Sequence, residues 1–274
     1  MRHKEHHDCR IEYERGIKAG RGSGRYENYR PWITVQDVPS HANKIRAACL
    51  KQQRLIHCLS GGEYLSFLQL DFDDRVVEIR EQFPLDPNVT LKLCEEYGVR
   101  HAGSNFGRNG IVMTTDFLIT IKLEDGYAFK ALQIKDSQSA LTARTQDKLI
   151  IEREYWQRQG IKYALYLSSD YNQVLCDNLK ILAPLRNTRI QPSLLQEAAF
   201  LGKKLLDYPQ LKLIEAQPLI NVNIPEIGGV VGGHQLIMLM LAKKIWICTV
   251  INQLPLQDVK IKDLRVQEDF RWSF

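Results

Sequence analysis

Two adjoining β-strands occupy the middle of the chain, and they carry polar residues where a packed core would need apolar ones. The run Ile111–Leu123 is rich in β-branched residues, Glu124-Asp125-Gly126 is typical of a tight turn, and Tyr127–Ile134 is apolar again. This pattern predicts a β-hairpin. Asp116 then lies on one strand, and Lys135 lies at the end of the other.

The polar residues of this hairpin suggest a chemistry. Side chains alternate between the two faces of a strand, so Gln133 and Lys135 share one face, and Leu132 and Ile134 share the other. Asp116 and Gln133 offer oxygen ligands for Mg²⁺, and a Lys can orient the attacking water or offset phosphate charge. The pattern therefore suits a metal-dependent nuclease. A solvated strand face is the alternative interpretation of the same spacing.

A further carboxylate precedes the hairpin. Ser60-Gly-Gly-Glu63 begins an apolar helix, and its Ser and Glu have the spacing of a capping box, in which the two side chains satisfy backbone groups of the first turn. This role explains Glu63 completely. The same carboxylate can instead reach the hairpin from a helix that packs behind the strands. The two roles compete for the same oxygen atoms.

Several segments in a fixed order resemble a known family. They are Pro31–Pro39, Ser60–Glu63, Asp74–Pro84, Thr115–Leu118 and Gln133–Lys135. In this order they resemble the TnsA family, the endonuclease subunits of heteromeric cut-and-paste DNA transposases. The resemblance is strongest from about Gly16 to Trp156. Its most specific parts are the run Arg80–Leu85 and the pair Pro31-Trp32.

The resemblance implies an α/β fold, a restriction-endonuclease-like mixed sheet flanked by helices. It implies that Glu63, Asp116 and Gln133 are metal ligands, and that these three residues and Lys135 are the catalytic set. Gln133 departs from the Asp or Glu usual in this nuclease superfamily, whereas Gln is the norm at the matching place in TnsA proteins. The implied cofactor is Mg²⁺, for which Mn²⁺ can substitute.

The resemblance also implies a reaction and partners. Such a subunit cuts the 5′ strands at the transposon ends in double-stranded DNA, while a TnsB-like transposase subunit cuts and joins the 3′ strands. A TnsC-like ATP-dependent regulator licenses both, so the nuclease is expected to be inactive alone. Two alternatives remain open: a stand-alone restriction or repair nuclease, and a non-catalytic winged-helix adaptor that binds DNA or protein without metal.

Basic charge is concentrated near the N-terminus. Residues 1–60 contain 12 Lys or Arg and 6 Asp or Glu, a net of +6, whereas the net charge of the whole chain is +5. A basic first fifth suggests contact with a polyanion. The glycine-rich run Gly16–Gly24 with Arg21, followed by Arg25, predicts a flexible segment along a phosphate backbone. A solvated loop without a DNA contact is the alternative. Arg80 is a third candidate DNA contact, and an edge salt bridge is its alternative.

The length of 274 residues is enough for two domains, and the hydrophobic fraction of 44% is typical of globular proteins. We expect a basic N-terminal arm over residues 1–55 that belongs to the catalytic domain. A nuclease core is expected over residues 56–169, and a separate domain over residues 170–274.

The C-terminal domain is expected to be winged-helix-like. Helices are predicted over Pro192–Leu206 and His234–Lys244, with a glycine-rich turn at Gly228–Gly233 between them. The strand-like run Ile245–Ile251 follows, which completes the order of a winged helix. The tail Val266–Phe274 is rich in aromatic residues, and we expect it to bind a partner protein. A strand that closes the domain is the alternative.

The six Cys residues, at positions 9, 49, 58, 94, 176 and 248, form no Cys-x-x-Cys pair. They are expected to be free thiols in a reducing cytoplasm. The longest apolar run, Leu236–Ala242, is too short to cross a bilayer. We therefore expect a cytoplasmic protein that does not bind a membrane. The resemblance to the TnsA family implies a bacterial protein that meets DNA at the nucleoid.

Overall fold

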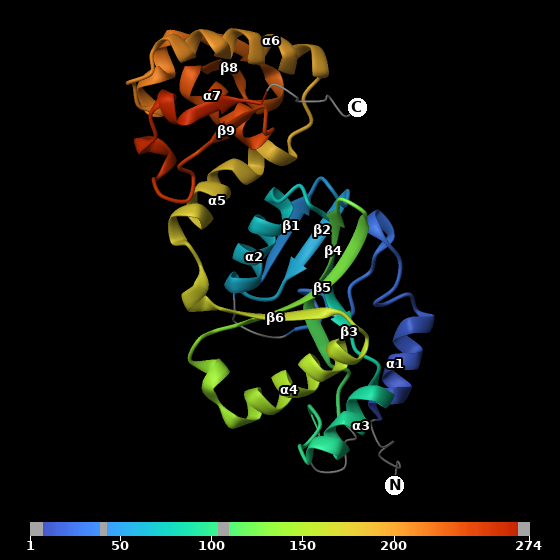
Figure 1. Cartoon of the computed structure of the whole chain (residues 1–274). Coiled ribbons are helices and arrows are strands. Elements are labelled where there is room, and N and C mark those ends of the chain that lie inside the picture. The colour runs from blue at the N-terminus through green and yellow to red at the C-terminus, as the bar shows by residue number, and fades with distance from the viewer. Residues whose placement is uncertain (1–7, 39–42, 104–109, 268–274) are drawn as a thin grey trace. The chain divides into compact units, whose positions relative to one another are not determined.

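A four-stranded sheet forms the centre of the first part of the chain (Figure 1). Its order is β3-β4-β5-β6, with the bounds Val76–Pro84, Thr114–Leu123, Gly126–Lys135 and Lys162–Leu167. Strands β3, β4 and β5 are antiparallel neighbours, and β6 runs parallel to β5. The predicted hairpin is confirmed as β4 and β5. The run Lys162–Leu167, whose sequence also predicts a strand, forms β6.

The computed structural model describes residues 8–38, 43–103 and 110–267. It divides into two compact units, Met1–Tyr171 and Asn172–Phe274. Most of the segment Gly103–Gly110, whose sequence predicts a loop, and most of the tail Val266–Phe274 lie outside the described residues. Within the part that is described, no helix has the length and apolar character needed to cross a membrane.

Helices flank the sheet of the first unit (Figure 1). On one side, α2 (Gly61–Phe72) packs with the small antiparallel hairpin of β1 (Ile45–Cys49) and β2 (Arg54–Cys58). On the other side lie α3 (Pro87–Tyr97) and α4 (Ala143–Arg158), and α1 (Cys9–Lys18) packs beside α3. This mixed sheet with helices on its faces confirms the predicted α/β class.

The helix ends follow local capping signals, and one of them corrects the sequence interpretation. The run Asp86-Pro87-Asn88 is typical of a turn, and the residues after it predict a helix from Leu91 to Tyr97. Instead α3 begins at Pro87, because the Asp86 side chain accepts a hydrogen bond from the Asn88 backbone N–H at 2.8 Å. Gly98 ends the helix in the left-handed conformation, with φ of 64°.

The N-terminal arm is more ordered than its composition suggests. Trp32 is 3% exposed and packs near Tyr13, with ring centroids 5.7 Å apart. The run Gly16–Gly24 was expected to be flexible, but backbone hydrogen bonds join Gly22 to Arg30 at 2.6 Å and Arg30 to Ser23 at 3.0 Å. The arm is therefore part of the folded first unit.

The second unit contains α5 (Gln173–Asn187), α6 (Pro192–Gly202) and α7 (Gly233–Ala242). An antiparallel pair, β7 (Asn221–Ile224) with β8 (Gly229–Gly232), precedes α7, and β9 (Trp246–Cys248) pairs with β10 (Leu264–Val266). The glycine-rich run was predicted to be a turn, but most of it forms β8. The winged-helix assignment stays a prediction.

Lys243 has a structural role in this unit. Its ammonium donates to the Arg186 carbonyl at 2.8 Å and to the Thr188 carbonyl at 2.5 Å, at the end of α5. Burial lowers the pKa of Lys243 to about 8. A side chain held in this way closes a helix end and offers little charge to an external phosphate.

Candidate active site

Asp116 lies at the centre of a polar cluster on the sheet. Its side chain is largely buried, and Oδ2 accepts a hydrogen bond from the Ile134 backbone N–H at 2.8 Å. The Lys135 Nζ lies 3.9 Å from the same oxygen. Because β4 and β5 pair in register, residues 18 apart in the sequence meet here. The Asp116 side chain is thus fixed by the neighbouring strand.

Gln133 is buried and hydrogen-bonded to β4, whereas Lys135 is partly exposed to solvent. The Gln133 Oε1 accepts a hydrogen bond from the Asp116 backbone N–H at 3.1 Å, and its side chain is 5% exposed. A carbonyl oxygen has a second lone pair, so Oε1 can still ligate a cation. The Lys135 side chain is 30% exposed. It can therefore reach a substrate that approaches from solvent.

Glu63 caps its helix and also faces the cluster. Ser60 Oγ donates to Glu63 Oε1 at 3.0 Å, and the Leu59 backbone N–H donates to Oε2 at 2.8 Å. Ser60 Oγ in turn accepts from the Glu63 N–H at 3.2 Å. The Glu63 carboxylate is 6% exposed and is joined to Asp116 through one intervening side chain. Glu63 therefore makes the capping contacts and faces the cluster at the same time, although the sequence presented these two roles as alternatives.

The intervening side chain is Gln82 of β3, which sequence reasoning missed. Its Nε2 lies 3.2 Å from Glu63 Oε2 and 3.4 Å from Asp116 Oδ1, and its Oε1 accepts from Thr114 Oγ1 at 3.0 Å. The Gln82 backbone has φ of 47°, a left-handed conformation that costs a non-glycine residue about 1–2 kcal/mol. Such strain is often found at functional sites.

Ionisation of both Glu63 and Asp116 is unfavourable in this buried cluster. Burial, and then the nearby Asp116 carboxylate, raise the pKa of Glu63 from 4.5 to about 8. Burial also raises the pKa of Asp116, although Lys135 opposes this. A cation shared by both groups would favour their ionised forms. A positive ion between the two carboxylates would therefore lower their pKa values.

The donor chemistry fits a hard divalent cation. Glu63 and Asp116 supply carboxylate oxygens, and Gln133 supplies an amide oxygen, the ligand types that Mg²⁺ prefers. Among the described residues, no group of three or more His, Cys, Asp and Glu side chains is placed to hold a metal. The candidate site combines two carboxylates with the amide oxygen of Gln133.

A second buried glutamate lies close to the site. Glu152 of α4 is 3% exposed, and its Oε1 accepts from Thr115 Oγ1 at 2.7 Å. Thr115 Oγ1 accepts in turn from the Trp156 indole N–H at 2.7 Å. Burial raises the pKa of Glu152 to about 8. Its single hydrogen bond to a hydroxyl does not stabilise the ionised form enough to offset desolvation.

This raised pKa predicts a stability change with pH. Because the unfolded chain loses the Glu152 proton near pH 4.5, stability should fall from there up to about pH 8, by roughly 1.4 kcal/mol per pH unit. Glu152→Gln keeps the acceptor for Thr115 and cannot ionise. In urea unfolding with EDTA, we expect the variant to match the wild type at pH 4.5 and to exceed its stability at pH 8.

A matched control for this experiment is Glu95→Gln, which changes an exposed glutamate of α3. Its difference from the wild type should not vary with pH over the same range. If the Glu152→Gln difference were equally constant, Glu152 would be ionised within the fold, and the raised pKa would be wrong.

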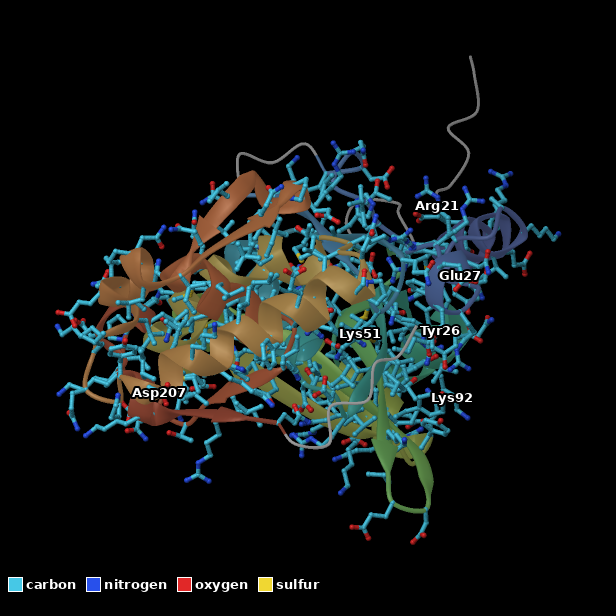
Figure 2. All side chains as sticks on the ribbon, turned by 90° about the horizontal axis from the view of Figure 1, so that it is seen from above. Arg21, Tyr26, Glu27, Lys51, Lys92 and Asp207 are labelled. Carbon is cyan, nitrogen blue, oxygen red and sulfur yellow. The ribbon has the colours of Figure 1, made fainter. Side chains whose placement is uncertain are left out.

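The three arginines proposed to contact DNA have different environments. Arg21 is on the surface (Figure 2); its side chain is 47% exposed, and it lies 3.6 Å from Asp37. Arg25 forms an ion pair with the fully buried Glu78 at 2.7 Å. Arg80 is 12% exposed and lies over the Phe83 ring, with a longer contact of 3.7 Å to Glu78. For Arg80 this geometry favours the salt-bridge alternative, and its phosphate contact stays a prediction.

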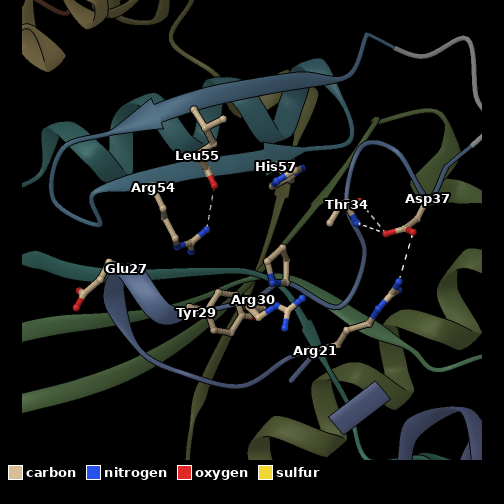
Figure 3. A pocket seen from close by; sticks show the side chains of 10 residues that line it. Arg21, Glu27, Tyr29, Arg30, Thr34, Asp37, Arg54, Leu55 and His57 are labelled. Atoms are coloured by element: carbon tan, nitrogen blue, oxygen red, sulfur yellow. Dashed lines mark hydrogen bonds and ion pairs between the residues drawn. The ribbon is translucent and has the colours of Figure 1, made fainter. Parts of the chain in front are cut away.

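A pocket of about 450 Å³ is lined by residues of the arm and of β2 (Figure 3). Its lining includes Arg21, Arg30, Arg54 and His57. The cations have partners within the protein: Arg54 binds Glu81 at 2.6 Å, and Arg30 donates to the Ala19 carbonyl at 3.1 Å. These two arginines of the pocket are therefore held by groups of the protein itself.

Comparisons with known proteins agree with this geometry. Residues 73–168, which include β3 to β6, match a family model described as TnsA-like endonuclease N terminal. The chain is also 35% identical over 215 residues to the Transposon Tn7 transposition protein TnsA of Escherichia coli, an alignment that covers 77% of each protein. The mixed sheet is thus that of a restriction-endonuclease-like domain. The chain belongs to the TnsA family, the endonuclease subunits of transposases.

Proposed function

We propose that this chain cuts the 5′ strands at transposon ends by Mg²⁺-dependent hydrolysis. The observation that carries the proposal is the convergence of two buried carboxylates, from α2 and β4, with a lysine ammonium 3.9 Å from one of them. Membership of the TnsA family supports transposon ends as the substrate. Mn²⁺ is expected to substitute for Mg²⁺, because both accept oxygen ligands.

The proposed roles follow from the donor atoms. Glu63, Asp116 and Gln133 would hold the cation, which when bound stabilises charge on phosphate oxygens and lowers the pKa of the attacking water. Lys135 is the most exposed member of the set, and its ammonium would contact the scissile phosphate and orient the water. Asp116 connects the cation ligands to Lys135, because its Oδ2 is a candidate ligand and also lies near the Lys135 ammonium.

We also propose that the subunit acts in a complex. A TnsB-like transposase subunit would cut and join the 3′ strands, and a TnsC-like ATP-dependent regulator would license both. The second unit, residues 172–274, is the proposed place for a winged-helix-like domain that contacts DNA or a partner protein. Family membership supports these partners, since the relative is named as a transposition protein.

A cleavage assay tests this function. The full chain is mixed with a transposon-end duplex labelled at the 5′ strand, in Mg²⁺ or EDTA, with and without the TnsB-like and TnsC-like proteins. We expect 5′-strand cuts only with Mg²⁺ and both partners. Cutting without partners would support the stand-alone nuclease instead, and DNA binding without cutting in any condition would support the adaptor.

The DNA contact proposed for Arg21 predicts a change in salt dependence. Each phosphate neutralised by a cation contributes about 0.9 to the slope of log affinity against log salt. Arg21→Ala should therefore make the slope shallower by roughly 0.9 in fluorescence anisotropy with duplex DNA. The matched control is Arg75→Ala, whose side chain is 77% exposed and pairs with Asp73.

An unchanged slope for Arg21→Ala would remove this residue from the interface. Deletion of the whole arm is a poorer test, because Cys9 and Trp32 pack in one buried cluster of the first unit. Loss of DNA binding after such a deletion would not be separable from unfolding. Point substitutions on the exposed surface avoid this difficulty.

A further inference from the structure

The Gln82 amide occupies the position between the two carboxylates. Its Nε2 lies 3.2 Å from Glu63 Oε2 and 3.4 Å from Asp116 Oδ1, so one neutral donor faces both acidic groups. The Gln82 side chain is 2% exposed, which excludes bulk water from this role. A donor shared by two carboxylates offsets part of their repulsion but supplies no net charge.

The backbone of Gln82 is shaped for this position. Strand pairing joins Glu81 to Phe117 and Phe83 to Thr115, which places Gln82 opposite Asp116 without a regular ladder pair. The Gln82 carbonyl instead accepts from the Trp32 N–H at 3.2 Å. The left-handed φ of 47° thus marks a local break in β3 at the cluster.

The hydrogen bond to the amide oxygen permits the amide to reverse. Its oxygen is held only by the Thr114 hydroxyl, at 3.0 Å, and a hydroxyl can accept as well as donate. A half-turn of the amide would exchange Nε2 and Oε1 and keep a hydrogen bond to Thr114. Gln133 differs in this respect, because its oxygen accepts from a backbone N–H that cannot change roles.

We propose that Gln82 is a positioning residue of the metal site, which holds Glu63 and Asp116 together without metal and turns its oxygen toward a bound cation. This inference rests on the proposed function, since it requires a cation at the two carboxylates. In the metal-free site the Gln82 side chain donates to the carboxylates, and in the metal-bound site it offers its oxygen as a ligand. Gln82 thus adds an amide oxygen to the one from Gln133.

The test uses the full chain, freed of metal with EDTA and dialysed, and Mn²⁺ alone as the probe. Mn²⁺ binding is measured by isothermal titration calorimetry, and Tm is measured without metal. Gln82→Met keeps length but removes both amide atoms, so Mn²⁺ affinity should fall about tenfold. Gln82→Glu adds a charged oxygen ligand, so Mn²⁺ affinity should rise about tenfold while the metal-free Tm falls.

The matched control is Gln52→Met. Gln52 is fully buried in the same unit, and its Nε2 donates to the Val77 carbonyl at 3.1 Å, outside the cluster. This variant should lower Tm and leave Mn²⁺ affinity unchanged. It separates the loss of a buried amide from the loss of a metal-site residue.

Two outcomes would overturn the inference. One is unchanged Mn²⁺ affinity in both Gln82 variants with a lower Tm, which would leave Gln82 a purely structural role. The other is weaker Mn²⁺ binding by Gln82→Glu, which would mean that this oxygen does not approach the cation. If Gln82→Met failed to fold, the direction of change in Gln82→Glu would still decide. Asp116→Asn that bound Mn²⁺ as tightly as the wild type would instead refute the proposed function.

Discussion

Replacing Asp116 with Asn should abolish 5′-strand cleavage and leave the fold intact. The Asn oxygen can still accept from the Ile134 N–H, a bond of 2.8 Å in the wild type, so strand pairing should survive. The charge that attracts the cation is lost, and metal stabilisation of the reacting phosphate is worth several kcal/mol. We expect a rate at least about a thousandfold lower in the complete transposition complex.

Stability provides a second measurement on the same variant. Asp116 is a buried carboxylate beside Glu63, and burial raises its pKa. Removal of this group should leave the metal-free Tm equal or higher, because a desolvated acidic group is gone. Asp125→Asn, in the exposed β4–β5 turn, is the control and should cut normally. Near-normal cleavage by Asp116→Asn would refute the assigned site.

Replacing Lys135 with Ala should slow cleavage by roughly a hundredfold or more, while Mn²⁺ binding persists. A charged ammonium is a donor only and cannot ligate a cation, so the ligand set remains. The variant loses the ammonium that orients the water and contacts the scissile phosphate. A group positioned in this way contributes a factor of about 10²–10⁴ to the cleavage rate. Single-turnover cleavage and Mn²⁺ calorimetry on one preparation measure the two effects separately.

Lys130→Ala is the matched control for Lys135. It lies on the same strand, β5, and its ammonium is 5.7 Å from the Tyr166 ring centroid. This substitution should change neither the rate nor metal binding. If Lys135→Ala lost metal binding together with activity, the site would have collapsed, and a separate role for the ammonium would be unsupported.

Much of the fold was predictable because its signals are local. The β4–β5 hairpin follows from alternating β-branched residues around a tight turn, and Gly126 takes φ of 136° in it. Ser60 begins α2 because its hydroxyl accepts a hydrogen bond from a backbone N–H three residues later. The signals for β6 and for the end of α3 at Gly98 are equally short in range. Asp116, Gln133 and Lys135 could be singled out as polar residues of this hairpin, whereas their grouping with Glu63 came from the resemblance to the TnsA family.

Other features depend on residues far apart in the sequence. Gln82 and Asp116 are 34 residues apart, and Glu152 and Thr115 are 37 apart, so no local pattern links them. In the sequence, Gln82 is one polar residue in an alternating strand, and Glu152 is one of several charged residues on a helix. Burial, which raises the pKa of Glu152 and encloses the Gln82 amide, arises only when strands and helices pack together.

The basic residues show the same division between local and distant causes. Their number and their concentration in residues 1–60 are properties of the sequence alone. Whether each charge is available is set by its partners: Arg21 is half exposed, whereas Arg54 is held by Glu81 at 2.6 Å and Lys243 by two backbone carbonyls. Composition fixes how much charge a chain carries, and packing fixes how much of it faces solvent, because ion pairs form between segments that only the folded chain brings together.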